Sequence, residues 1–195
     1  MKTTAACAAA LAAIAFAGAL SAHHSLSMFD LSHPTWIKGT VIRYEQIDPH
    51  VMILLDERKE DGNVRRLNIE GPNLGRLARL GVPADFLKAG DTIEVCGFSF
   101  KDEWRNHNPA SSSVPAFHGH MLVLPAGRMT SWGPYGKLVN CVRPNDQAQS
   151  WAEFLNSEPL ARDLWCRSLA YVQTALIPPQ AVVDEISGLI KNPCT

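Results

Sequence analysis

The hydrophobic pattern in the first two thirds of the chain predicts a sheet of short strands. Apolar and β-branched residues alternate with polar ones in runs bounded by Gly, Pro and Asp, which is typical of strands because successive side chains point to opposite faces. The expected strands are residues 36–45, 51–56, 64–70, 92–100 and 120–124, with residues 128–132 extending the sheet. Between the third and fourth strands, leucines at helical spacing predict a helix over residues 72–80 and a short helical turn over 83–87.

Irregular positions punctuate this sheet. Gly39 lies within the first strand and predicts a bulge or a sharp bend there. Asp48-Pro49 predicts a turn or an extended break before the second strand. Residues 101–117 are polar and rich in Ser, Pro and Asn, so we expect a long loop before the fifth strand.

Three strands, a helix and two further strands predict a mainly β fold. The expected architecture is a small five-stranded antiparallel barrel, because closure of the sheet removes exposed strand edges. The nearest common architecture is the oligonucleotide/oligosaccharide-binding (OB) barrel. We expect residues 23–132 to form this OB-like barrel and residues 133–195 to form a C-terminal helical extension. Its expected helices are residues 147–155, 158–176 and 180–191. The second has an apolar face of Leu160, Leu164, Trp165, Leu169, Val172 and Leu176.

Residues 1–22 have the pattern of a signal peptide. Lys2 is followed by an apolar stretch over residues 5–20, and small residues suit cleavage after Ala19 or after Ala22. No later run of 18 apolar residues exists, so we expect no membrane span once the leader is removed. The sequence therefore predicts a periplasmic or secreted protein.

Four cysteines follow the leader. In an exported chain, Cys96, Cys141, Cys166 and Cys194 predict two disulfides, for which three connectivities exist. Cys194 is expected to join Cys166 or Cys141. The alternative for Cys96 is a buried free thiol.

The charge balance and the missing motifs exclude several classes of function. Lys and Arg total 18 against 19 Asp and Glu, a net charge of −1, so there is no basic footprint for nucleic acid. The chain has no phosphate loop, G-x-S-x-G or H-E-x-x-H motif. We therefore expect no enzymatic activity. A copper-dependent oxidoreductase is the alternative, and it needs His23 at the mature N-terminus.

Histidines are the residues that point to chemistry. Neutral imidazole is a common ligand of copper and zinc, and five of the seven histidines are candidate ligands: His23, His24, His50, His118 and His120. Alternation places the last two on one face of a strand. If His23 is the first residue, its amine and ring can chelate copper. If Ala22 is the first residue, His24 is the third. The Ala22 amine, two backbone nitrogens and the His24 imidazole can then surround Cu(II).

Other interpretations of these residues remain open. Without a metal, His23 and His24 are expected in a solvated arm and His50 in a turn. His118 and His120 are then expected to form a hydrogen-bonded pair at the entrance of a strand. The alternative function is a barrel that binds a partner protein, a lipid or a polymer through its loops, with Trp104, Trp132 and the 101–117 loop as its features. These tryptophans, with Tyr135 and Trp151, either line a pocket or fill the barrel–helix interface.

Four segments share a pattern with known sequences. They are Ala22 to Asp30 after the leader, Gly39-Thr40-Val41 with Pro49-His50, Glu70 to Asn73 with Leu77 to Gly81 and Leu87 to Asp91, and Leu124 to Gly127. In these segments, within residues 22–127, the chain resembles a family of uncharacterised exported bacterial proteins classed as a domain of unknown function. The resemblance implies a small periplasmic barrel and carries no established activity. Asp48 stands where that pattern has Asn, and the helical tail is an addition to it.

Overall fold

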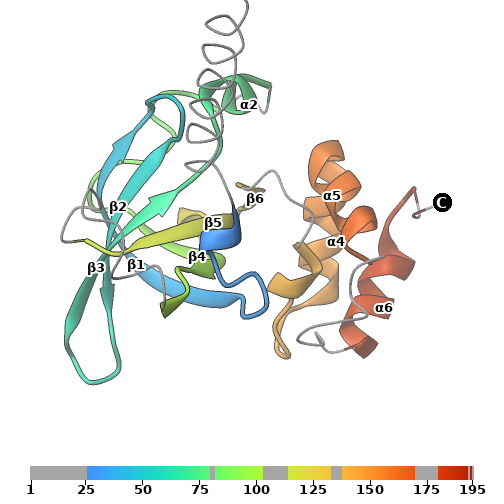
Figure 1. Cartoon of the computed structure of the whole chain (residues 1–195). Coiled ribbons are helices and arrows are strands. Elements are labelled where there is room, and N and C mark those ends of the chain that lie inside the picture. The colour runs from blue at the N-terminus through green and yellow to red at the C-terminus, as the bar shows by residue number, and fades with distance from the viewer. Residues whose placement is uncertain are drawn as a thin grey trace, which may run out of the picture.

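The computed structural model describes residues 26–79, 82–102, 114–132, 138–169, 180–192 and 194. Strands form one part of the molecule, and the helices near the C-terminus pack on one side of it (Figure 1). The predicted signal peptide lies outside the described residues. Among the residues described, no helix is long and apolar enough to cross a membrane.

The strands form a closed barrel with one extra strand. They are β1 (Thr35–Glu45), β2 (Met52–Arg58), β3 (Val64–Glu70), β4 (Thr92–Ser99), β5 (Ala116–Val123) and β6 (Met129–Ser131). The sheet order is β3-β2-β1-β4-β5-β6, and a parallel β3–β5 pairing closes the first five strands. The predicted five-stranded barrel is confirmed. The difference is that its closing pair is parallel while the other pairs are antiparallel.

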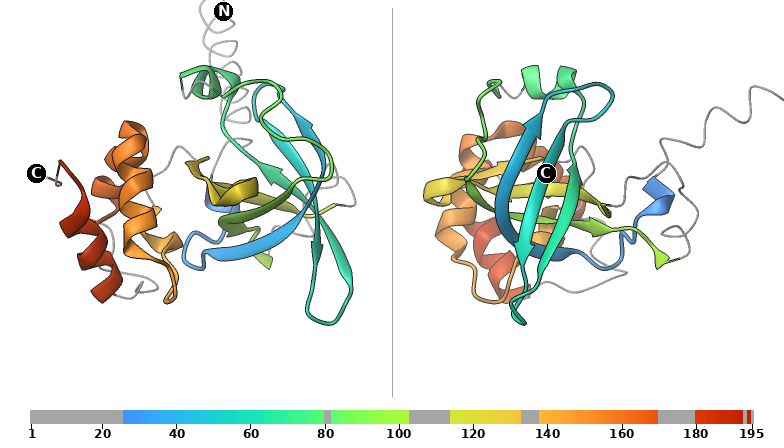
Figure 2. Two further views of the ribbon diagram at one scale, coloured as in Figure 1. Left: turned by 180° about the vertical axis from the view of Figure 1, so that it is seen from behind. Right: turned by 90° about the vertical axis from the view of Figure 1, so that its left-hand side faces the viewer.

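The first strand pairs with two neighbours along its length, with β4 over Thr35–Thr40 and with β2 over Gly39–Glu45. A β-bulge falls between Val41 and Arg43 in the pairing with β2, so the predicted irregularity is displaced from Gly39. Gly39 has another role, since a Cβ there would lie 2.6 Å from the Asp56 carbonyl oxygen. The close approach of two strands therefore requires glycine at this position. Figure 2 shows the β2–β3 hairpin reaching beyond the rest of the barrel.

The inward-facing residues of the strands make the barrel core. They include Val41, Ile53, Leu55, Ile69 and Val95, all fully buried. The short helix α2 (Leu74–Arg79) follows β3 and buries Leu77 in the same core. The predicted helical turn at 83–87 is wrong, because the described residues there form turns and bends that lead into β4.

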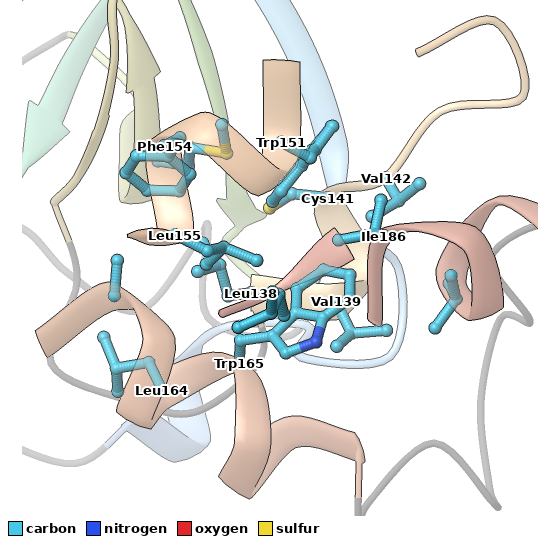
Figure 3. Close-up of a cluster of buried hydrophobic side chains, with 14 of the residues drawn as sticks. Leu138, Val139, Cys141, Val142, Trp151, Phe154, Leu155, Leu164, Trp165 and Ile186 are labelled. Carbon is cyan, nitrogen blue, oxygen red and sulfur yellow. The ribbon is translucent and has the colours of Figure 1, made fainter. Parts of the chain in front are cut away.

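A second core lies between the barrel and three helices. The helices are α4 (Ala148–Ser157), α5 (Pro159–Leu169) and α6 (Gln180–Leu189). Trp151 and Trp165 lie 5.6 Å apart between ring centroids and pack around Ile186 (Figure 3). One predicted contact is wrong, since Leu160 at the start of α5 is 38% exposed.

Two disulfides hold the helical part in place. Cys96 on β4 is bonded to Cys141, and Cys166 on α5 is bonded to Cys194 near the C-terminus. The first bond joins the barrel to the segment that leads into the helices. Two disulfides were predicted and are confirmed, and the alternative of a free thiol at Cys96 is wrong.

Polar contacts reinforce the same junction. Arg143 donates to Glu94 on β4 at 2.7 Å and to Asp146 at 2.9 Å. Its guanidinium lies 4.2 Å from the ring centroid of Trp36, whose indole N–H donates to the Cys141 carbonyl at 2.9 Å. The helical part is therefore fixed to the outer surface of β1 and β4 by a covalent bond, an ion pair and a stacked arginine.

Candidate functional site

Two candidate ligands project from the outer face of β5. Phe117 and Leu122 of this strand face the barrel core, so His118 points outward. In the pairing with β4, Gly97 lies opposite Gly119 while Cys96 lies opposite Met121, which makes His120 the extra residue of a bulge. The two imidazole rings have centroids 5.0 Å apart. The strand begins at Ala116, earlier than predicted, so both histidines lie within it.

Aromatic side chains cover this pair. The ring of Phe98 on β4 lies edge-on to His120 at 4.7 Å, and the ring of Phe29 lies 5.0 Å from His118. Phe29 also stacks on Phe100 at 4.6 Å. The two histidines are only 3% and 2% exposed as a result. Burial lowers the pKa of His118 from 6.5 to about 4, with a smaller contribution from the nearby imidazole of His50.

Backbone pairing holds the aromatic cover in place. Phe29 forms an isolated antiparallel bridge with Phe100. The Asp30 amide donates to the Ser99 carbonyl at 2.9 Å, and the Lys101 amide donates to the Met28 carbonyl at 2.9 Å. The segment that follows the predicted cleavage site therefore pairs with the end of β4, directly above His118.

His50 reaches the same side of the barrel from the turn before β2. The Val51 amide donates to the Pro72 carbonyl at 3.0 Å, and the Gly71 amide donates back to the Val51 carbonyl at 2.8 Å. The Nδ1 atom of His50 lies 3.2 Å from the Gly71 carbonyl oxygen and 3.2 Å from Oε1 of Glu70. Closure of the barrel brings this group to β5.

Glu70 links the two parts of the site. In the parallel β3–β5 pairing its Cα partner is His118, and in the β2–β3 pairing its partner is Met52. Leu67 and Ile69 of β3 face the core, which places the Glu70 side chain on the outer face. Glu70 therefore stands between β2 and β5 in the sheet, and its carboxylate contacts His50.

Three of the five predicted ligands thus lie on one side of the barrel. They are His50, His118 and His120, and we call them the histidine cluster. The other two, His23 and His24, lie outside the described residues. Within the part of the chain that the structure describes, no three His, Cys, Asp or Glu side chains meet closely enough to hold an ion by themselves. His33, which was not a candidate, bonds Asp30 at 2.6 Å through Nδ1 and is exposed.

Sequence reasoning missed Glu70 and the aromatic cover. Glu70 and Phe29 both lie in segments that carried the family resemblance, but a single strand pattern does not say which strands become neighbours. The aromatic residues proposed for partner binding take other places. Trp132 is 1% exposed in the barrel core, and Trp151 is 1% exposed among the helices, while Trp104 and Tyr135 lie outside the described residues.

A shallow cleft of about 420 Å³ lies at another place on the surface. Two turns border it, one at Gly90-Asp91 and one at Pro125 to Gly127, and β4 forms part of its floor. Of the candidate histidines that the structure describes, His50, His118 and His120, none lines it. The cleft and the histidine cluster are therefore separate features of the barrel.

These features define a small closed β-barrel with a disulfide-bonded helical extension and a covered histidine cluster. The chain belongs to the family described as "Family of unknown function (DUF6152)", whose sequence pattern matches residues 10–108. The resemblance drawn from the sequence motifs is thereby confirmed. No curated protein matches the chain.

A solved structure gives a further comparison. A crystal structure of the mitochondrial single-stranded DNA binding protein Rim1 from S. cerevisiae is similar at 12% identity and a TM-score of 0.34. The similarity covers 48% of this chain and 93% of that one. At this TM-score the similarity carries no functional information, and nucleic-acid binding has no support.

Proposed function

We propose that this is an exported protein that binds a transition-metal ion, copper or zinc, through histidines. One observation carries the proposal: His118 and His120 are buried side by side on β5 with ring centroids 5.0 Å apart. Imidazole nitrogen suits copper and zinc, and a metal ligand must be in its neutral form. The lowered pKa of His118 keeps that imidazole neutral in mildly acidic as well as neutral solution.

The proposed ligand set is completed from two directions. His50 approaches from the turn before β2, where its ring contacts Glu70. His23 and His24 precede Phe29, whose ring contacts His118. Five residues of chain span at most about 18 Å, which is the upper limit on the distance between His24 and Phe29. With cleavage after Ala22, the new amino group adds a further nitrogen donor.

The disulfides and the leader pattern support the proposed location. Bonded pairs of cysteines form and persist in oxidising compartments, and this chain has two of them. Residues 1–22 have the pattern of a signal peptide. Together these features support a periplasmic or secreted protein that meets metal ions outside the cytoplasm.

The test begins with the processed protein. Mass spectrometry of exported material identifies the mature N-terminal residue, and Cu(II) is then titrated into metal-free protein and followed by visible spectroscopy. We expect the wild type to saturate at one equivalent. We expect His118→Gln to bind Cu(II) at least about tenfold more weakly than the wild type, because that variant lacks one ligand nitrogen. His33→Gln is the matched control, since this exposed histidine pairs with Asp30 outside the cluster.

Three results would contradict the proposal. One is the absence of a saturable signal in correctly processed protein. Another is equal weakening by His33→Gln and His118→Gln, which would indicate adventitious binding to surface imidazoles. The third is an unchanged titration when His23 and His24 are both replaced by alanine together with His118→Gln.

A further inference from the structure

The imidazole of His50 meets two hydrogen-bond acceptors at the same nitrogen. Its Nδ1 lies 3.2 Å from the Gly71 carbonyl oxygen and 3.2 Å from Oε1 of Glu70. A carbonyl or carboxylate oxygen has no hydrogen to donate, so Nδ1 must carry the proton for both contacts to be attractive. In the neutral imidazole the lone pair then lies on Nε2.

We propose that Glu70 is a positioning residue for metal binding by His50. Its carboxylate and the Gly71 carbonyl hold the ring as the Nδ1–H tautomer, and Nε2 is the atom that binds the ion. The inference rests on the proposed metal-binding function and adds a residue to it. In a metal-binding histidine, the ring nitrogen that does not bind the metal donates its N–H to a carboxylate or a backbone carbonyl. This hydrogen bond orients the ring and makes the ligand nitrogen more basic.

The surrounding backbone places His50 beside Gly71 and Glu70. The paired hydrogen bonds of Val51 with Gly71 and Pro72 continue the β2–β3 ladder past Met52 and Glu70. The backbone of His50 is therefore held one residue beyond a regular antiparallel pair, beside Gly71. The Glu70 side chain leaves the ladder at the position that pairs with His118. One carboxylate thus sets the orientation of His50 beside the β5 histidines.

The tautomer is measured first, in metal-free protein. Long-range ¹H–¹⁵N correlation spectra distinguish protonated from unprotonated imidazole nitrogens, and His50→Gln assigns the signal. We expect the Nδ1–H form at neutral pH in the wild type. This readout does not depend on any metal and therefore separates the geometry of His50 from the binding function.

Metal affinity is measured next, by competition titration of Cu(II) against a chelator. We expect Glu70→Ala to bind about tenfold more weakly, which is the usual cost of removing such a partner of a ligand. Glu70→Gln recovers part of the loss, because its amide oxygen still presents an acceptor to the Nδ1–H group, without the charge. Glu57→Gln is the matched control, since Glu57 pairs with Arg65 at 2.6 Å near the other end of the same hairpin.

Each result decides one question. An Nε2–H tautomer of His50, or wild-type affinity in Glu70→Ala, overturns the positioning role while the metal-binding function stands. If the wild type binds no metal, the proposed function fails, and the role of Glu70 fails with it even where the Nδ1–H form is observed. Should Glu70→Ala not fold by circular dichroism, the wild-type tautomer and the affinity of Glu70→Gln relative to Glu57→Gln decide.

Discussion

Acid should destabilise the metal-free protein through His118. This imidazole is 3% exposed, and burial lowers its pKa from 6.5 to about 4. Between those values the unfolded chain binds a proton that the folded protein does not, so stability falls as the pH falls through this window. A difference of one unit between the folded and unfolded pKa values corresponds to about 1.4 kcal/mol of unfolding free energy. Relative to pH 7.5, the expected loss from this group is about 2 kcal/mol at pH 5 and about 3 kcal/mol at pH 4.

The assay is urea unfolding followed by circular dichroism, with a chelator present, at several pH values from 7.5 to 4. Other groups titrate in the same range, so the wild type is compared with His118→Gln, which keeps a polar side chain and removes the titrating ring. We subtract the unfolding free energy of His118→Gln from that of the wild type at each pH. Relative to pH 7.5, this difference should fall by about 2 kcal/mol at pH 5 and by about 3 kcal/mol at pH 4. Parallel curves for the two proteins, or an NMR titration of His118 near 6.5, would refute the reasoning.

Three further changes have definite expected outcomes in urea unfolding. Cys166→Ser with Cys194→Ser opens a cross-link with a sequence separation of 28 residues, so chain entropy predicts a loss of about 3.6 kcal/mol; wild-type stability would contradict this. Gly97→Ala places a Cβ against the His118 carbonyl, and we expect a loss of about 1–3 kcal/mol or more, whereas an unchanged midpoint would show that the strands separate easily. Phe29→Ala should cost about 3 kcal/mol and raise the pKa of His118 toward its ordinary value, since it removes part of the cover; an unmoved NMR titration would contradict the role of the aromatic ring.

Much of the barrel could be predicted from local patterns. Alternation located β3 at Val64–Glu70 and β1 within one residue of its start, because one face of each strand is buried. The start of β5 could not be predicted, since Ala116 and Phe117 follow a Ser- and Pro-rich run that is typical of a loop. The pairing with β3 and β4, rather than local propensity, makes these residues a strand.

The candidate site divides in the same way. The shared face of His118 and His120 followed from their spacing, because residues two apart on a strand point to the same side. The approach of His50 and Glu70 to that pair depends on the β3–β5 closure, which joins segments far apart in the chain. The disulfide partners of Cys96 and Cys166 depend on three-dimensional distance, and so they remained open in the sequence.

The bond from Cys96 to Cys141 has a practical consequence for producing parts of this protein. The family pattern ends at residue 108, before β5 and before the partner cysteine. A fragment cut there would expose the edges of β3 and β4 and leave the Cys96 thiol without its partner, two features that promote aggregation and mispaired dimers. The shortest fragment worth expressing therefore extends past residue 141, so that the half of the chain that carries the family pattern depends on the half outside it.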